Sequence, residues 1–203
     1  ETLLAHEEKT VTLACLGPLT NVAMAMVKEP RIIPRIKEIV LMGGGYFEMG
    51  NITPAAEFNI YVDPDAADVV MRSGVPITMV PLDVTHMMQS TKPRLERIRA
   101  LGNKAGAAVY DMLSFSERFD LKKYESEGAP LHDPCVMAYM LKPDLFQGRH
   151  INVEIETGSE LTVGMTVADY WGVTNRPKNV NFLRSGNADG FFALLTERLA
   201  RLP

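Results

Sequence analysis

Short apolar runs that alternate with helix-like segments are the feature that most restricts the fold of this chain. The runs have the length of β-strands and cover residues 11–16, 38–42 and 76–83. Two helical segments separate them, residues 22–27 with Thr20 or Asn21 as the predicted cap, and residues 63–74 with Asp63 as the cap. Two successive strand–helix–strand units predict an α/β fold with an open, mostly parallel sheet flanked by helices.

The final third of the chain has a different pattern. Residues 151–156 alternate between apolar and polar side chains, and a second apolar run at residues 161–167 follows a glycine-containing turn. This pattern predicts a β-hairpin with one face in water. Before it, residues 92–122 are helical in composition with a break near Gly102, and an amphipathic helix is predicted at residues 189–202.

Composition and charge restrict the partners of the chain. The chain has 203 residues, of which 46% are hydrophobic and 23% charged, as in ordinary globular proteins. A net charge of −4 without a basic block argues against a nucleic-acid-binding surface. We also expect no membrane partner, because no apolar stretch approaches the ~20 residues of a membrane-spanning helix and no signal peptide is recognisable. Cys15 and Cys135 lie in apolar runs, which predicts buried free thiols and a cytoplasmic location.

The loop after residues 38–42 carries several polar side chains that could bind a ligand. Asn51, Glu57 and Asn59 follow three consecutive glycines in this loop. Ligands of open α/β sheets bind outside the carboxyl ends of the strands, and amide and carboxylate groups match the hydroxyls of a polyol. The same composition is also typical of an ordinary turn.

His132 and Asp133 form a second candidate site, directly before a predicted helix. Asp133 is suited either to capping that helix or to binding a divalent cation. His132 is suited to donating a proton to a leaving group near neutral pH. Four segments at strand ends or helix starts are expected to meet at one edge of the sheet, namely residues 17–21, 42–59, 82–86 and 132–134.

Seven motifs in a fixed order give the chain a family resemblance. They are Gly17-Pro18-Leu19-Thr20-Asn21, Met42-Gly43-Gly44-Gly45, Gly50-Asn51, Ala56-Glu57-Phe58-Asn59, Asp63-Pro64-Asp65-Ala66-Ala67, Leu82-Asp83-Val84-Thr85-His86 and His132-Asp133-Pro134. In this order they resemble the inosine–uridine preferring nucleoside hydrolase family, and the resemblance runs from about residue 10 to the C-terminus. It implies a nucleoside hydrolase-like fold, a ribonucleoside substrate split into ribose and free base, and a tightly bound Ca²⁺ ion.

The resemblance also implies which residues bind the ion and the sugar. Asp133 would be a carboxylate ligand of Ca²⁺, and Leu16 would offer its backbone carbonyl. Asn51 would bind ribose hydroxyls near the ion. Glu57 and Asn59 would hold the 5′-hydroxyl of the ribose.

The remaining roles concern the sugar face and the base. The resemblance implies that Met42 packs under the sugar and that His132 protonates the leaving base. Asp120 and Tyr124, with Phe119 behind them, are candidates for the base pocket, although a solvated loop explains them equally well. These residues leave both purine and pyrimidine bases open.

The chain departs from the family in one respect. The Asp-rich signature of the family, D-x-D-x-G-x-D-D, has no match here, and it supplies most of the carboxylates that bind the metal ion. Residues 1–203 therefore resemble the C-terminal two thirds of a nucleoside hydrolase, a single partial domain without its N-terminal strands. We expect this fragment alone to be inactive and the whole protein to be an active homo-oligomer, a dimer or a tetramer.

Two other functions remain open from the residues alone. A non-catalytic nucleoside- or ribose-binding protein would use Asn51, Glu57 and Asn59 but would not need His132. A metal-dependent phosphohydrolase is suggested only by the adjacent histidine and aspartate. Such enzymes are generally all-helical, and the predicted strands argue against them.

Overall fold

The chain divides into two compact units. The computed structural model describes residues 1–124 and 127–203, with side chains for residues 1–116 and 127–203. Unit 1 comprises residues 1–83 and 147–184, and unit 2 comprises residues 84–146 and 185–203. The expectation of a single partial domain stays a prediction, and each unit is described by itself.

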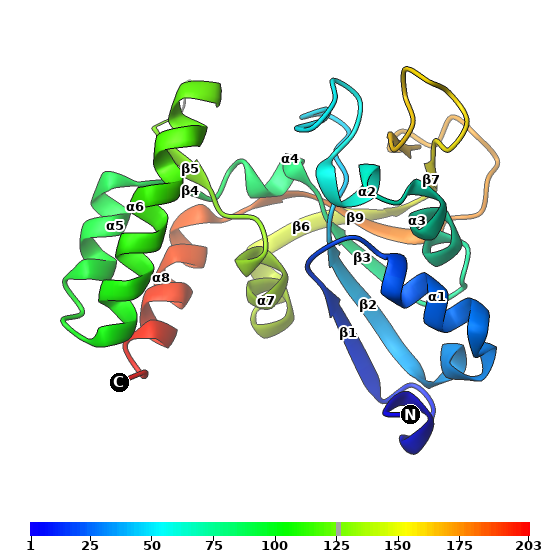
Figure 1. Cartoon of the computed structure of the whole chain (residues 1–203), viewed down its shortest axis with the longest axis horizontal. Helices are drawn as coiled ribbons and strands as arrows, with labels where there is room; N and C mark the ends of the chain where they lie inside the picture. The colour runs from blue at the N-terminus through cyan, green and yellow to red at the C-terminus, as the bar shows by residue number, and fades with distance from the viewer. Residues whose placement is uncertain (125–126) are drawn as a thin grey trace. The chain divides into compact units, whose positions relative to one another are not determined.

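Unit 1 is built on a five-stranded sheet (Figure 1). The strand order is β1-β2-β3-β9-β6, and the first four strands run parallel to their neighbours. The strands are β1 (Val11–Cys15), β2 (Ile36–Met42), β3 (Ile77–Val80), β9 (Val180–Gly186) and β6 (Phe146–Ile151). The predicted mostly parallel sheet is confirmed.

Helices cover this sheet, so its central strands are buried. Ile39, Val40 and Met79 are fully shielded from solvent, as expected for parallel strands that are covered on both faces. Helices α1 and α3 pack against each other in this unit. The helical elements of unit 1 are η1 (Leu3–Ala5), α1 (Thr20–Lys28), η2 (Pro30–Arg35), α2 (Phe58–Tyr61) and α3 (Pro64–Met71), and α4 (Leu82–Thr85) follows β3 at the boundary with unit 2.

The two predicted helix caps differ in outcome. Asp63 caps α3, because its Oδ1 accepts the Ala66 N–H at 3.0 Å. For α1 the predicted cap is wrong: the helix starts at Thr20, and Leu19 stands at the cap position without a side-chain hydrogen bond. The Thr20 hydroxyl donates instead to Asp63 Oδ2, so it links the starts of the two helices.

The predicted β-hairpin is present but shorter than the sequence pattern. It consists of β7 (Val153–Ile155) and β8 (Thr166–Ala168), which pair antiparallel. Residues 157–165 form turns and irregular chain instead of a continuation of the strands. Met165 forms a bridge with Ala56, and the hairpin therefore supports the polar loop that follows β2.

Unit 2 contains helices and a small antiparallel sheet. The predicted helical segment breaks where expected, because α5 (Lys92–Arg99) and α6 (Lys104–Tyr124) are separated by a turn with Gly102 at a φ of 69°. Helix α5 packs against both α6 and α8 (Ala188–Leu199), as Figure 1 shows. The other elements are β4 (Gln89–Thr91), which pairs with β5 (Gly128–Pro130), and α7 (Pro134–Leu141) with η3 (Pro143–Leu145).

The prediction of buried free thiols is met in the described residues. Cys15 and Cys135 are both buried and free. Among the residues that the structure describes, none belongs to a helix that is both long and apolar enough to cross a membrane.

Candidate functional site

The residues predicted to bind ribose lie at the carboxyl ends of β1 and β2 in unit 1. Leu16 directly follows β1 and is 40% exposed, and the buried Met42 ends β2. Asn51, Glu57 and Asn59 lie in the segment that follows β2. Three of these residues, Met42, Glu57 and Asn59, are joined by the contacts described next.

Glu57 is a buried carboxylate at the start of a short helix. It is only 3% exposed, and its Oε2 accepts N–H groups of Gly44 and Asn59 at 3.0 Å each and of Ile60 at 3.3 Å. Glu57 is thereby the N-cap of α2, a helix that the sequence pattern did not indicate. Backbone donors hold the carboxylate in one orientation because they satisfy an anion that would be costly to bury alone.

Asn59 is fixed to the end of β2. It is 8% exposed, and its Nδ2 donates to the carbonyl oxygen of Met42 at 3.1 Å and contacts the Met42 sulfur at 3.3 Å. The structure therefore places the two residues in direct contact. A buried amide next to a buried carboxylate provides both donors and acceptors for a hydroxyl ligand.

Asn51 closes the loop onto α2. Its side chain is half-buried, and its Oδ1 accepts the Phe58 N–H at 2.9 Å. Gly50 precedes it with no room for a side chain, because a Cβ there would collide with the backbone of Thr53 and Ala56. The chain therefore folds tightly between Gly50 and Phe58, and Asn51 has a fixed position on this fold.

Gly44 joins the loop to its surroundings. Its φ is +76°, and a Cβ at this position would lie 2.6 Å from Thr166 Oγ1. Its N–H donates to Glu57, and its carbonyl accepts the Leu82 N–H at 2.9 Å. Only glycine combines this backbone conformation with so close an approach.

Unit 2 holds the candidate proton donor. Nδ1 of His132 lies 2.8 Å from the Thr85 hydroxyl, and Thr85 is fully buried. The ring of His86 lies nearby, with its centroid 5.9 Å from that of His132. A hydrogen bond to one ring nitrogen fixes the orientation of the imidazole. It also determines which of the two ring nitrogens can exchange a proton. Sequence reasoning did not single out Thr85, although it belongs to the motif of residues 82–86.

Asp133 does not cap the helix that follows it. It precedes α7, yet its side chain makes no capping hydrogen bond, so the capping interpretation is wrong. The residue is exposed to solvent, but partial burial of its carboxyl group raises its pKa. Asp133 is therefore a carboxylate that its own helix does not use.

The described residues do not by themselves form a metal centre. Among them, no group of three or more His, Cys, Asp and Glu side chains is placed to hold an ion. A calcium ion takes about six to eight oxygen ligands, whereas the carboxylate of Asp133 has only two oxygens to offer. The side chains of Phe119, Asp120 and Tyr124, the candidates for the base pocket, lie outside the described residues.

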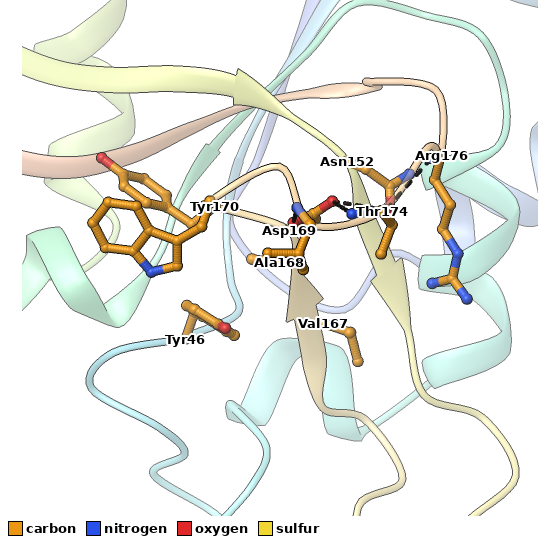
Figure 2. Close-up of a pocket in the computed structure, with 10 residues that line it drawn as sticks. Tyr46, Asn152, Val167, Ala168, Asp169, Tyr170, Thr174 and Arg176 are labelled. Carbon is orange, nitrogen blue, oxygen red and sulfur yellow. Dashed lines mark hydrogen bonds between the residues drawn. The ribbon is translucent and has the colours of Figure 1, made fainter.

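A separate pocket of about 150 Å³ lies in unit 1 (Figure 2). Its walls include Tyr46, Trp171 and Arg176, and it contains none of the predicted site residues. Asp169 stands at this pocket with both carboxylate oxygens occupied. They accept the N–H groups of Val173 and Thr174 at 2.7 and 2.8 Å and the Thr174 hydroxyl at 2.7 Å, and these bonds lower the pKa of Asp169. Asp169 therefore serves to shape its own loop.

Comparison with known proteins finds relatives that match nearly the whole chain. Over all its 203 residues the chain is 50% identical to an uncharacterized protein of Schizosaccharomyces pombe, of which it covers 66%. Over 97% of its length it is 49% identical to the pyrimidine-specific ribonucleoside hydrolase RihA of Shewanella oneidensis, of which it covers 62%. Its length is thus less than two thirds of each of these relatives.

A solved structure and a family profile also match nearly the whole chain. The purine-preferring ribonucleoside hydrolase from Gardnerella vaginalis superposes with a TM-score of 0.86 at 33% identity, covering 96% of this chain and 62% of that one. The profile described as inosine-uridine preferring nucleoside hydrolase matches residues 1–193. A match over nearly the whole chain shows that it belongs to the inosine–uridine preferring nucleoside hydrolase family.

Proposed function

We propose that the whole protein hydrolyses the N-glycosidic bond of ribonucleosides to ribose and free base. The observation that carries this proposal is the buried polar group at the end of β2. Here Glu57 and Asn59, 3% and 8% exposed, are held rigidly by backbone groups and by Met42. Family membership and the two ribonucleoside hydrolases compared above support the same reaction.

The chemistry explains why a rigid sugar site is useful. When the bond between C1′ and the base nitrogen breaks, its electron pair leaves with the base, and the ribose becomes cation-like before a water oxygen bonds to C1′. That water loses one proton to solvent, which balances the proton that the base gains. Asn51, Glu57 and Asn59 hold the ribose hydroxyls in this proposal, with Met42 beneath the sugar. Fixing the position and pucker of the sugar lowers the barrier because less motion must be frozen at the transition state.

His132 supplies the proton that the leaving base requires. Thr85 engages Nδ1 of the imidazole at 2.8 Å, so Nε2 is the nitrogen assigned to the base. Proton donation from Nε2 neutralises the charge that accumulates on the base nitrogen as the bond breaks. General acid catalysis of this kind contributes about 10²–10⁴-fold to the rate.

We assign the metal ion to the whole protein and not to this chain alone. Ca²⁺ is the proposed ion, and Asp133 with the backbone carbonyl of Leu16 are the ligands that this chain would contribute. The residues that the structure describes do not complete such a site. For the same reason, we propose that the isolated chain of 203 residues is inactive.

The sequence identities to the two hydrolases also bear on which base the substrate carries. The chain is 49% identical to a pyrimidine-specific hydrolase and 33% identical to a purine-preferring one. We therefore propose uridine and cytidine as better substrates than inosine. A cytoplasmic location and assembly into a dimer or tetramer remain predictions.

The test is ribose release by the full-length gene product from uridine and inosine. We expect turnover that is lost on addition of a calcium chelator and restored by Ca²⁺. The variants H132A and E57Q should each lower kcat/KM, and the surface variant K37A should match the wild type. Absence of ribose release from both nucleosides in the presence of Ca²⁺ would refute the proposed function.

A non-catalytic nucleoside-binding protein is the second candidate. It would use the same buried sugar contacts, because Glu57 and Asn59 can hold hydroxyl groups whether or not the glycosidic bond is cleaved. Calorimetry separates the two functions. Heat of uridine binding without ribose release, unchanged in H132A, would establish the binding protein.

A further inference from the structure

Asp83 is a buried carboxylate that binds the loop following β2. It is 5% exposed and lies in α4, just beyond the end of β3. Its Oδ2 accepts the N–H of Tyr46 at 3.0 Å, and its Oδ1 accepts the N–H groups of Phe47 and Glu48 at 2.7 and 3.3 Å. Three consecutive backbone donors therefore converge on one side chain of α4, the helix that follows β3.

The loop held by Asp83 is compact and transmits this constraint. A Cβ at Gly45 would collide with the carbonyl of Met49, and Met49 itself adopts a left-handed backbone with φ +61°. The next residue, Gly50, packs equally closely on the backbone of Thr53. The chain between residue 48 and Asn51 is therefore packed too tightly to absorb a shift of residues 46–48. Such a shift would displace Asn51 as well.

A second connection passes through Gly44. Leu82, the neighbour of Asp83, donates its N–H to the Gly44 carbonyl at 2.9 Å. The N–H of the same glycine donates to Glu57 Oε2 at 3.0 Å. The start of α4 is thus linked to both ends of the segment that carries Asn51 and Glu57.

We propose that Asp83 is a positioning residue that sets the geometry with which Asn51 and Glu57 hold the ribose. Asp83 acts through the loop and not by touching the sugar, and the inference rests on the proposed function. A carboxylate suits this task because it accepts several N–H groups at once and makes stronger hydrogen bonds than a neutral acceptor.

Asp169 provides a matched control within the same unit. Like Asp83, it accepts backbone N–H groups of a loop, two where Asp83 accepts three, and it accepts a hydroxyl as well. Its loop, residues 169–174, carries none of the proposed sugar contacts. Replacing Asp with Asn therefore weakens the same kind of hydrogen bonding in two loops. The loop held by Asp83 leads to the proposed sugar contacts, and the loop held by Asp169 carries none of them.

The experiment compares D83N and D169N in the full-length gene product. We expect D83N to raise KM and lower kcat for uridine, with kcat/KM falling at least about tenfold, the size expected for lost charged hydrogen bonds. D169N should stay within about twofold of the wild type. In an E57Q background the further loss caused by D83N should be much smaller, because residues that act through one contact are not additive. Equal losses in D83N and D169N, or a full D83N loss on top of E57Q, would overturn the proposal.

Hydrogen exchange of the backbone amides gives a readout that does not need turnover. In D83N, exchange should increase from residue 46 through residue 59 and stay unchanged in α1, residues 20–28. Residues 169–174 are not a suitable reference here, because Tyr170 packs on Phe47 with ring centroids 5.3 Å apart. An increase confined to residues 46–49 would overturn the proposal for Asp83, whether or not the wild type releases ribose. If the wild type releases no ribose, that result by itself refutes only the proposed function. Failure of D83N to fold while D169N folds would also overturn it, because Asp83 would then be required for the fold and not for the loop.

Discussion

The hydrogen bond between Thr85 and His132 gives the most direct test of the proposed proton donor. Replacing Thr85 with Val keeps the shape of the side chain and removes the hydroxyl that lies 2.8 Å from Nδ1. The imidazole then loses the contact that fixes which nitrogen faces the base. We expect T85V to lower kcat/KM for nucleosides while leaving the fold intact.

The magnitude follows from the environment of the hydroxyl. Thr85 is 0% exposed, so water cannot easily replace it. A hydrogen bond to a charged group contributes about 1.5–3 kcal/mol, and 1.4 kcal/mol corresponds to a factor of ten, so the loss should lie at about 10–150-fold. The total contribution of a general acid, about 10²–10⁴-fold, sets the upper limit.

The assay separates proton donation from other effects by a change of leaving group. Uridine requires protonation of its base, whereas p-nitrophenyl riboside releases an anion that is stable without a proton. T85V and H132A should therefore both be slow with uridine and within about twofold of the wild type with p-nitrophenyl riboside. T85S, which keeps a hydroxyl, should recover most of the uridine activity.

The controls define what would refute this reasoning. T196V removes another hydroxyl of unit 2, which donates to the Phe192 carbonyl at 2.7 Å, and should leave both substrates unaffected. On an H132A background, T85V should add no further loss with uridine. Equal slowing of both substrates by T85V, or an unchanged rate with uridine, would show that Thr85 does not act through His132.

Four further predictions follow from contacts described above. The isolated chain of 203 residues should release no ribose from uridine at any Ca²⁺ concentration, and measurable turnover would refute this. Burial raises the pKa of Cys15 to about 11 and raises that of Cys135 as well, so neither thiol should react with a thiol reagent at pH 8 until urea unfolds the protein. G44A should destabilise the chain by about 2 kcal/mol in urea unfolding, because the new methyl group meets Thr166 and the backbone is left-handed; a loss below about 0.5 kcal/mol would contradict this. D133N should weaken Ca²⁺ binding by the full-length gene product in calorimetry, and it should leave the melting temperature of the metal-free protein unchanged.

The sequence predicts those parts of unit 1 whose signals are local. The strands β1, β2 and β3 are apolar runs of strand length, and Asp63 before Pro64 indicates the start of α3, as the structure confirms. The entry of β9 and β6 into the same sheet is not local. It depends on pairing between β9 and β3, segments about 100 residues apart, and no pattern within either segment specifies that partner.

The site was predictable in its residue types but not in its hydrogen bonding. Glu57 is not among the preferred N-cap residues, so nothing in the sequence marks it as the start of α2. Asp133 is among them and was expected to be equally suited to a cap, yet it makes no capping bond. For Glu57 a tertiary contact adds to the cap, because Gly44 brings a third donor. For Asp133 no contact in the described residues explains why α7 begins without a side-chain cap.

The three carboxylates at these strand ends and helix starts differ in a way that separates their tasks. Glu57 and Asp83 are buried and each accepts three backbone N–H groups, so their charge is balanced within unit 1 and their positions are fixed. Asp133 is exposed and receives no hydrogen bond as a helix cap. Balanced carboxylates can shape a loop without any ion, whereas a carboxylate that the fold leaves unbalanced gains most from a cation. The loop that carries the sugar contacts should therefore keep its shape without calcium, and the ion should matter for Asp133 alone among the three.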